Sequence, residues 1–289
     1  MRARRSVKKR WFKKWLHGRC PGVAGSFRYF GVKVFFPPGS RSFAIACDQG
    51  IFEAENVSVL QAMAKPNTTV FDVGANIGLM AIPMLTHVSG CRVISFEPSE
   101  NTVPYLQKTI EGSAFKDRWS LVPKAVGSKS GRVSFSLSRK KDSLFDGLKP
   151  TGRVPAVGAI EVEMTTLDEI WRNSGRPKIS LIKCDVEGAE MQVLEGAAEI
   201  LRQEKPSVLL EWNGKNLKAY DCPSNAICDF AATNGYSLYS VPGGTKVNNP
   251  HELALQMAFT ESFLLLPAMI NRGAEELIET AASPLATRP

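Results

Sequence analysis

The stretch VFDVGANIG, residues 70–78, decides the fold class of this 289-residue chain. Its apolar first half is typical of a buried strand, and Gly74 and Gly78 follow where that strand would end. Glycine lets the backbone turn tightly and approach a ligand without a Cβ in the way. We therefore predict a strand, a ligand-binding turn and a helix that begins near Ile77.

The chain after Asn67 alternates strand-like and helix-like runs. The strand-like runs are TTVFDVG, CRVISFEP, WSLVPKAVG, ISLIKCDVEG, SVLLEWNG, YSLYSVP and MAFTESFLLLP. Helix-like runs cover residues 79–87, 100–112, 167–174, 189–203 and 224–234. This alternation is typical of an α/β fold with apolar parallel strands. We predict a mostly parallel seven-stranded sheet with helices on both faces, and an extra antiparallel pair formed by GRVSFSLS and AIEVEMTTL.

Charge divides the chain into a basic arm and a mildly acidic body. Residues 1–47 hold twelve of the 36 Lys and Arg residues and none of the 28 acids. Overall nucleic-acid binding is therefore not indicated, and nucleic acid is not expected as a partner. The arm also carries Trp11, Phe12 and Trp15. It could be a solvated tail, a segment in peripheral contact with an anionic membrane, or a transit or nucleic-acid segment.

The runs FRYFGVKVFF and SFAIACD, separated by PPGSRS, predict two extended segments in a hairpin-like lead-in, followed by a helix that stops before Pro66. The six cysteines lack metal-binding spacing, which favours a reducing compartment and no metal site. No apolar run reaches the ~18 residues of a membrane-spanning helix. We expect a cytoplasmic protein, with peripheral contact at the inner membrane surface as the alternative.

The spacing of the glycines and the acid at the strand end discriminate between cofactors. The pattern Asp72-x-Gly74-x-x-x-Gly78 lacks one glycine of the dinucleotide pattern G-x-G-x-x-G. Asp72 would repel a pyrophosphate and suits a cationic ligand such as S-adenosylmethionine. Glu97, at the end of the next strand, can accept hydrogen bonds from both ribose hydroxyls. A nicotinamide-dependent oxidoreductase, and a plain turn with Glu97 capping the next helix, are the alternatives.

Six stretches occur in a fixed order between residues 70 and 212: VFDVGANIG, VISFEPS, LVPKAVG, TTLDEI, LIKCDVEGAEMQVLEGA and VLLEW. Together they resemble the FkbM-type family of S-adenosylmethionine-dependent methyltransferases. The resemblance implies a Rossmann-like class I methyltransferase domain that O-methylates a hydroxyl of a sugar, glycolipid or secondary metabolite. It also implies that Gly74, Ala75 and Asn76 contact the methionine part of the cofactor. Glu97 would bind the ribose, and Ala125 would lie near the adenine.

These assignments divide the chain into four segments. They are the basic arm (1–25), a strand and helix lead-in (26–66), the S-adenosylmethionine-dependent methyltransferase domain (67–267) and a C-terminal tail (268–289). The expected partner is a small-molecule, glycan or glycolipid acceptor with a free hydroxyl. Other interpretations are an RNA methyltransferase guided by the arm and a binding protein with an inactive methyltransferase fold.

The second motif, LIKCDVEGAE, supplies the candidate catalytic residues. Strand alternation places Lys183, Asp185 and Glu187 on one side. A hydroxyl must lose its proton as it attacks the methyl group, so a nearby base helps. Asp185 and Glu187 are our candidates, with Glu211 of VLLEW third. Alternatively, Glu187 and Glu190 cap a helix, or three carboxylates bind a divalent ion.

Overall fold

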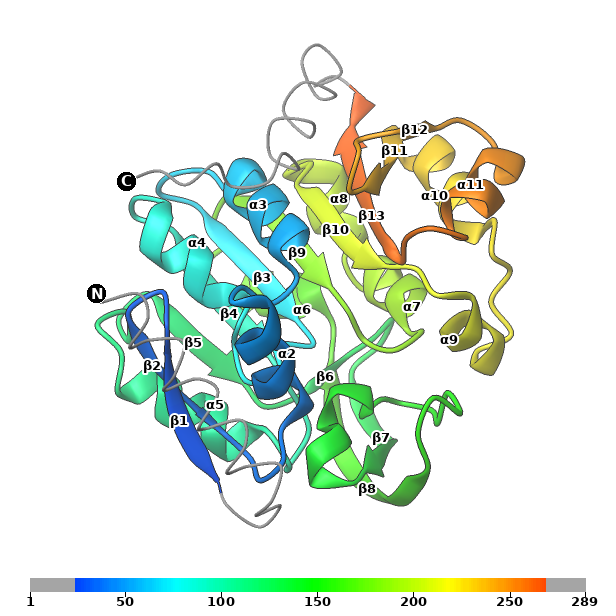
Figure 1. Cartoon of the computed structure of the whole chain (residues 1–289). Coiled ribbons are helices and arrows are strands. Elements are labelled where there is room, and N and C mark those ends of the chain that lie inside the picture. The colour runs from blue at the N-terminus through cyan, green and yellow to red at the C-terminus, as the bar shows by residue number, and fades with distance from the viewer. Residues whose placement is uncertain (1–23, 269–289) are drawn as a thin grey trace.

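The computed structural model describes residues 24–268, and the greater part of both the basic arm and the C-terminal tail lies outside them. Eight strands form the central sheet, in the order β12-β11-β13-β10-β9-β3-β4-β5 (Figure 1). Their bounds are β3 Thr69–Val73, β4 Arg92–Phe96, β5 Trp119–Val122, β9 Ile179–Cys184, β10 Ser207–Glu211, β11 Tyr236–Val241, β12 Lys246–Val247 and β13 Ser262–Pro267.

The prediction of a mostly parallel sheet is confirmed. β5, β4, β3, β9 and β10 pair in parallel, and β13 enters antiparallel between β10 and β11. The sheet has eight strands rather than seven because the two-residue strand β12 adds to the edge beside β11. The carboxyl ends of β3, β4, β9 and β10 therefore lie along one edge of the sheet, where α/β folds bind ligands.

The run WSLVPKAVG does not form one strand as predicted. It splits into β5 and β6 (Ala125–Val126), because Pro123 lacks the N–H that would continue the ladder. β6 joins β8 (Ala156–Thr165), which pairs antiparallel with β7 (Gly131–Ser138) in a separate three-stranded sheet. The predicted antiparallel pair is thus confirmed.

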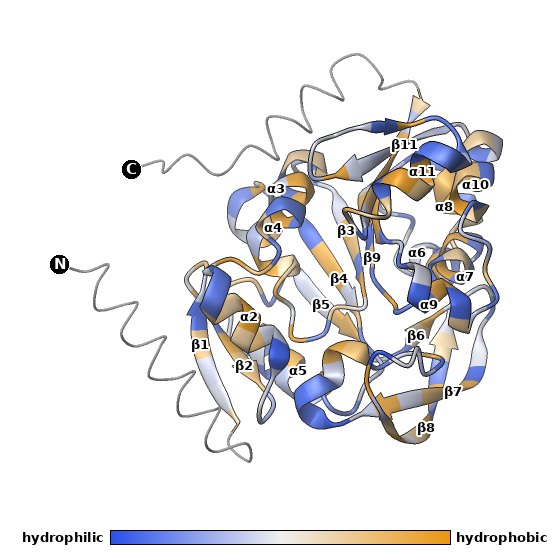
Figure 2. Cartoon of the chain, turned by 45° about the vertical axis from the view of Figure 1, so that its right-hand side comes forward, coloured by the Kyte–Doolittle hydropathy of each residue, from blue (hydrophilic) through white to orange (hydrophobic). Residues whose placement is uncertain are grey.

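Helices cover both faces of the central sheet, and each face has its own hydrophobic core. On one face lie α3 Ala54–Met63, α4 Ala81–His87 and α5 Val103–Glu111. On the other lie α6 Leu167–Asn173, α7 Glu190–Glu195, α8 Ala198–Gln203, α9 Gly214–Ala219, α10 Ala226–Asn234 and α11 Pro250–Gln256. Figure 2 shows hydrophobic residues along the central strands between these layers.

The single helix predicted over residues 189–203 is two helices. A Cβ at Gly196 would lie 2.1 Å from the carbonyl oxygen of Gly127, so the chain passes another backbone closely at the break. The Asp168 carboxylate then caps α8, accepting hydrogen bonds from the backbone N–H groups of Glu199 at 2.8 Å and Ile200 at 3.0 Å. A tertiary contact therefore sets this boundary.

One prediction for the lead-in, that SFAIACD is an extended segment, is wrong. Both strands of the lead-in hairpin, β1 (Gly25–Tyr29) and β2 (Val32–Phe36), lie within residues 25–36, which include FRYFGVKVFF, whereas SFAIACD lies in the helix α2 (Arg41–Gln49). Ser40 caps this helix through the N–H of Phe43. Helical geometry also lets the Phe43 ring stack on Phe36 with 4.0 Å between centroids. Among the helices of residues 24–268, none combines the length and apolar character that a membrane crossing requires.

Candidate active site

The loop after β3 packs directly on the end of β9. Gly74 has a φ of +74°, and a Cβ there would lie 1.8 Å from the carbonyl oxygen of Asp185. The Asp185 N–H in turn donates to Val73 O at 3.2 Å. Gly78 has a φ of +85°, and its Cβ would lie 2.7 Å from the Trp119 ring. Both glycines are therefore required by close packing as well as by backbone conformation.

Asp72 lies beneath this loop. Its side chain is fully buried, and Oδ2 accepts a hydrogen bond from Ser95 Oγ at 3.2 Å. The Lys183 ammonium is 3.9 Å from Asp72 Oδ1. Burial raises the pKa of Asp72, and Lys183 opposes this shift. Asp72 lines none of the three cavities around this loop, and its described partners are Ser95 and Lys183. A direct contact between Asp72 and the cofactor stays a prediction.

Lys183 connects the loop to the β9 end, and no role in the site was predicted for it from the sequence. Its Nζ donates to Gly74 O at 2.9 Å and lies 3.3 Å from Asp185 Oδ2. The register pairs Asp72 with Lys183 on β9 and with Ser95 on β4, so the three side chains are neighbours on one face of the sheet. Lys183 therefore orients both the glycine loop and the Asp185 carboxylate.

Glu97, at the end of β4, faces a narrow cavity. Only 6% of the residue is exposed, and its carboxylate accepts hydrogen bonds from the backbone N–H groups of Asn76 at 2.7 Å and Ser99 at 2.9 Å. Burial raises the pKa of Glu97 to about 7, against these hydrogen bonds. Gly74 and Ala125 line the same cavity, so three residues predicted to bind the cofactor lie together.

A second narrow cavity lies on the other side of the glycine loop, lined by Ala75, Asn76 and Lys183. The Asn76 side chain binds two other segments: Oδ1 accepts from Ser42 Oγ of α2 at 2.9 Å, and Nδ2 donates to Ser143 O at 3.3 Å. Ser143 belongs to the 3₁₀ helix η1 (Lys140–Phe145) in the long loop before β8. The lead-in and this loop therefore both contact the glycine turn.

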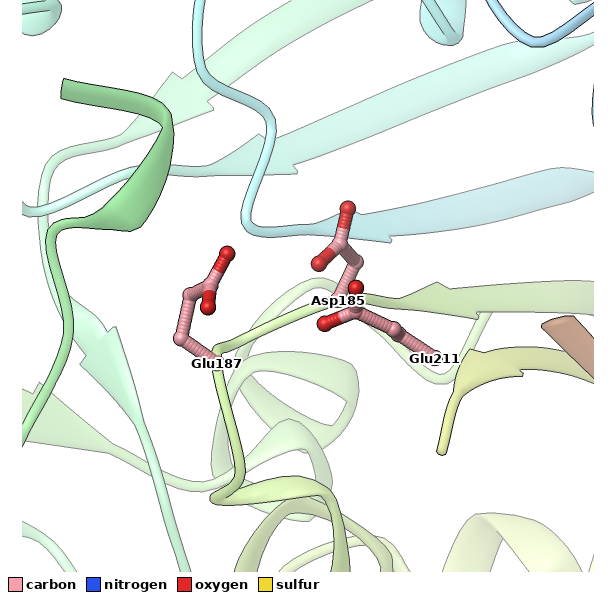
Figure 3. Close-up of side chains that lie close together, drawn as sticks. All are labelled: Asp185, Glu187 and Glu211. Carbon is pink, nitrogen blue, oxygen red and sulfur yellow. The ribbon is translucent and has the colours of Figure 1, made fainter. Parts of the chain in front are cut away.

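The three predicted catalytic carboxylates gather at the ends of β9 and β10 (Figure 3). Asp185, Glu187 and Glu211 each place an oxygen within 4.8 Å of the others. Burial raises the pKa of Glu187 to about 8, with the Asp185 charge adding to the shift, and raises that of Glu211 well above its usual range. Clustered carboxyl groups with raised pKa values are typical of catalytic sites.

Two residues that sequence reasoning missed hold this cluster. Asn216 Nδ2 donates to Glu187 and to Glu211, at 3.0 Å each. The Arg153 guanidinium lies 3.4 Å from Glu187 and 3.3 Å from Glu211. The alternative assignment of Glu190 as a helix cap agrees with the hydrogen bonds its carboxylate accepts from the N–H groups of Val186 and Gly188.

The same three carboxylates are the group, within residues 24–268, whose oxygens are close enough to ligate a metal ion. In this structure Lys183, Arg153 and Asn216 contact these oxygens. These oxygens thus already have protein donors or cations as partners, and the absence of a metal site stays a prediction.

A third cavity, of about 490 Å³, opens beyond Asp185 at the ends of β9 and β10. Lys183 lines it, and the turn before β13 and the start of α3 form its other walls. Asp185 lines all three cavities, and 28% of its side chain is exposed. Asp185 thus lies between the narrow cavities along the glycine loop and Glu97 on one side and the larger cavity, which has room for a small ligand, on the other.

The strand order, with the last strand antiparallel beside β10 and a glycine loop after β3, defines a Rossmann-like class I methyltransferase fold. The chain belongs to the FkbM methyltransferase family, because a family model described as "Methyltransferase FkbM domain" matches residues 72–236. The resemblance noted from the sequence is confirmed. The comparisons favour this family over the oxidoreductase interpretation.

Two relatives carry specific names. The chain is 28% identical over 153 residues to the hexuronic acid methyltransferase AglP of Haloferax volcanii, covering 52% of this chain and 58% of that protein. It is 26% identical over 183 residues to the 2-O-methyltransferase NoeI of Sinorhizobium fredii, covering 59% and 74%. The chain thus spans little more than half of the archaeal relative.

A crystal structure of methyltransferase FkbM from Methylobacillus flagellatus is 16% identical, with a TM-score of 0.44. The match covers 78% of this chain and 53% of that one.

Proposed function

We propose that this protein is an S-adenosylmethionine-dependent O-methyltransferase that acts on a hydroxyl of a sugar-like acceptor. The observation that carries the proposal is the position of Asp185, which lines both narrow cavities at the glycine loop and the large cavity beyond it. A carboxylate between a cofactor and an acceptor is placed to receive the proton that the acceptor hydroxyl loses. Family membership and the names of the two relatives support the reaction class.

The residues around the narrow cavities fit S-adenosylmethionine. Glu97 offers a buried carboxylate to the ribose hydroxyls, and Gly74 presents backbone without a Cβ to the methionine part. Ala125 lies in the Glu97 cavity, as expected for an adenine contact. Gly147 and Leu148 of the long loop also line that cavity of about 40 Å³, so we expect this loop to move outward when the cofactor binds.

The cofactor, when bound, supplies a methyl group on a sulfonium, which is already a good electrophile. The protein must align the acceptor oxygen with that carbon, which contributes at best about 7–11 kcal/mol. Lys183 fixes the Asp185 carboxylate from 3.3 Å away. Asp185 then accepts the hydroxyl proton, which adds roughly 10²–10⁴-fold to the rate. Burial raises the pKa values of Glu187 and Glu211, so near neutral pH these two groups favour the protonated form and leave Asp185 as the group that accepts the proton.

Two variants test this assignment. Glu97→Ala should weaken S-adenosylmethionine binding at least about tenfold in calorimetry, since a ribose contact to a buried charged group is worth ~1.5–3 kcal/mol. Asp185→Asn should preserve that binding and lower methyl transfer by roughly 10²-fold or more. Glu161→Gln, on the exposed face of β8, is the control and should change neither quantity. Unchanged cofactor affinity for Glu97→Ala would remove Glu97 from the ribose site, and wild-type turnover for Asp185→Asn would remove the proposed base.

A further inference from the structure

The large cavity beyond Asp185 is built from several separate parts of the chain. Glu53 and Glu55 come from the start of α3, and Asp185 and Glu211 from the ends of β9 and β10. Val241 ends β11 and Pro242 follows it, and residues 257–262 lead from α11 into the first residue of β13. Its volume of about 490 Å³ falls in the range of small-molecule binding pockets. Its contact with Asp185 makes it the acceptor side of the proposed reaction.

Carboxyl groups dominate the polar lining of this cavity. The described residues that line it include five carboxyl groups and one cation, Lys183; the carboxyl groups belong to Glu53, Glu55, Asp185, Glu211 and Glu261. Lys183 already lies between Asp185 and Asp72, at 3.3 Å and 3.9 Å. The cation among the described lining residues is thus already paired, so a carboxylate on the acceptor would lie beside acids without a free cation to balance it. Burial raises the pKa values of Glu53 and Glu211, and an acceptor carboxylate beside them would raise those pKa values further.

Arg153, which contacts the edge of this cavity, does not change that balance. Its guanidinium lies 3.3 Å from Glu211 and 3.8 Å from Glu261, and it also contacts Glu187. Three carboxyl groups thus share one guanidinium. An anionic acceptor would have to compete with them for it, and like charges placed together disfavour binding.

An exposed aromatic ring lies at the rim of the same cavity. Phe259 is 87% exposed, and Met257 and Ala258 beside it also line the cavity. A single exposed phenylalanine is ordinary on a protein surface. Here, however, the ring stands beside carboxylates that accept hydrogen bonds from hydroxyl groups. A sugar ring matches both features, because its C–H face can pack on the Phe259 ring and its hydroxyl groups can donate hydrogen bonds to the carboxyl groups of the cavity.

We propose that the acceptor is a neutral or amino-substituted sugar, and that the cavity excludes sugars bearing a carboxylate. This inference rests on the proposed function, since it describes the acceptor side of that site. It separates this chain from its relative named a hexuronic acid methyltransferase, with which it shares 28% identity over 153 residues.

Calorimetry with three trisaccharides of different charge tests the proposal directly. The probes are the trimers of N-acetylglucosamine, glucosamine and galacturonic acid, titrated at slightly acidic pH, where the glucosamine amines are protonated, and again at pH 8.5. At pH 8.5 the carboxyl groups with raised pKa values, Glu53 and Glu211, carry more negative charge. Each is titrated with and without S-adenosylhomocysteine, so that sugar binding is measured apart from turnover. We expect the first two trimers to bind and the galacturonic acid trimer to bind at least about tenfold more weakly, with high salt reducing the difference.

Two variants identify the residues responsible. Glu55→Lys reverses a charge at the exposed start of α3 and should narrow or invert the preference between the glucosamine and galacturonic acid trimers. Phe259→Ala should weaken all three trimers without changing their order. Glu161→Gln, far from the cavity lining, is the matched control, and circular dichroism checks that each variant folds.

The outcomes separate this inference from the proposed function. A galacturonic acid trimer that binds as tightly as the neutral trimer would overturn the charge argument. If S-adenosylmethionine binds through Glu97 but no trimer binds, the sugar class is wrong and the methyltransferase assignment stands. If the trimers bind in the expected order and S-adenosylmethionine does not bind, the cavity inference holds and the cofactor assignment is wrong.

Discussion

Replacing Gly74 by alanine tests the close packing that joins the glycine loop to the β9 end. The new Cβ would lie 1.8 Å from the Asp185 carbonyl oxygen, whereas such contacts do not fall below 3.0 Å. The oxygen must therefore move by about 1.2 Å, which strains the 3.2 Å hydrogen bond from the Asp185 N–H to Val73 O. The φ of +74° adds roughly 1–2 kcal/mol of left-handed backbone strain.

A matched control variant separates the effect of the atomic collision from the effect of backbone strain. Gly175, between α6 and β9, has a φ of +82°, but a Cβ there would meet no atom within 4 Å. Gly175→Ala therefore carries the same kind of backbone strain without the collision. We expect it to lower the free energy of unfolding by about 1 kcal/mol, and Gly74→Ala to lower it by at least about 3 kcal/mol, because a strained backbone and a lost hydrogen bond add.

Urea denaturation followed by tryptophan fluorescence measures both values, and the difference between them isolates the collision. Gly74→Ala should also reduce cofactor binding, because the displaced carbonyl belongs to the residue that lines all three cavities. Losses of unfolding free energy that agree within about 0.5 kcal/mol for the two variants would refute this account of the loop, since independent surface changes vary by that much.

Two further predictions concern charge. Burial raises the pKa of Glu97 and Glu190 to about 7, so between about pH 4.5 and pH 7 the folded protein binds protons more tightly than the unfolded chain does. The free energy of unfolding should therefore increase by roughly 1–3 kcal/mol from pH 8 to pH 6 in urea titrations; a flat profile would contradict these assignments. Arg153→Gln should cost about 1–3 kcal/mol at pH 8.5 and less at pH 6, where Glu187 and Glu211 are more fully protonated. Equal losses at both pH values would indicate that Arg153 acts through packing alone.

The parts of the site that the sequence predicted are those governed by local pattern. A strand that ends in glycines and a neighbouring strand that ends in an acid must meet at one edge of a parallel sheet. Gly74, Ala125 and Glu97 accordingly line one cavity. Asp185 and Glu187 also join one cluster, but not through the strand alternation that we assumed, because β9 ends at Cys184 and Glu187 lies in a turn with a φ of +58°.

The rest depended on tertiary contacts that no local pattern carries. Arg153 comes from a long loop without periodicity, and Asn216 from a one-and-a-half-turn helix that begins at a capping Asn213. The direction of Asp72 depended on register, because its partners Ser95 and Lys183 lie on two neighbouring strands. Knowledge of the strand pairing would have indicated the approach of Lys183 to Asp72.

Dependence on tertiary contacts also explains why the strand predicted for SFAIACD is a helix. SFAIACD has the apolar content of a strand, and its helical form follows from Ser40 as a cap and from the Phe43 ring against Phe36. Both contacts require the preceding hairpin to be in place. The boundary that we placed at residue 66 stays a prediction.

The N-terminal hairpin limits how far the chain can be shortened without disturbing the fold. The family match begins at residue 72, yet residues 24–66 share one hydrophobic core with α4 and α5. The N–H of Phe35 donates to Thr109 of α5, and Ser42 donates to Asn76 in the glycine turn. The segment that matches the family model is thus shorter than the segment that packs around this core. Shortening the chain to the matched segment would expose aromatic side chains of the core and remove the hydrogen bond from Ser42 to the glycine turn.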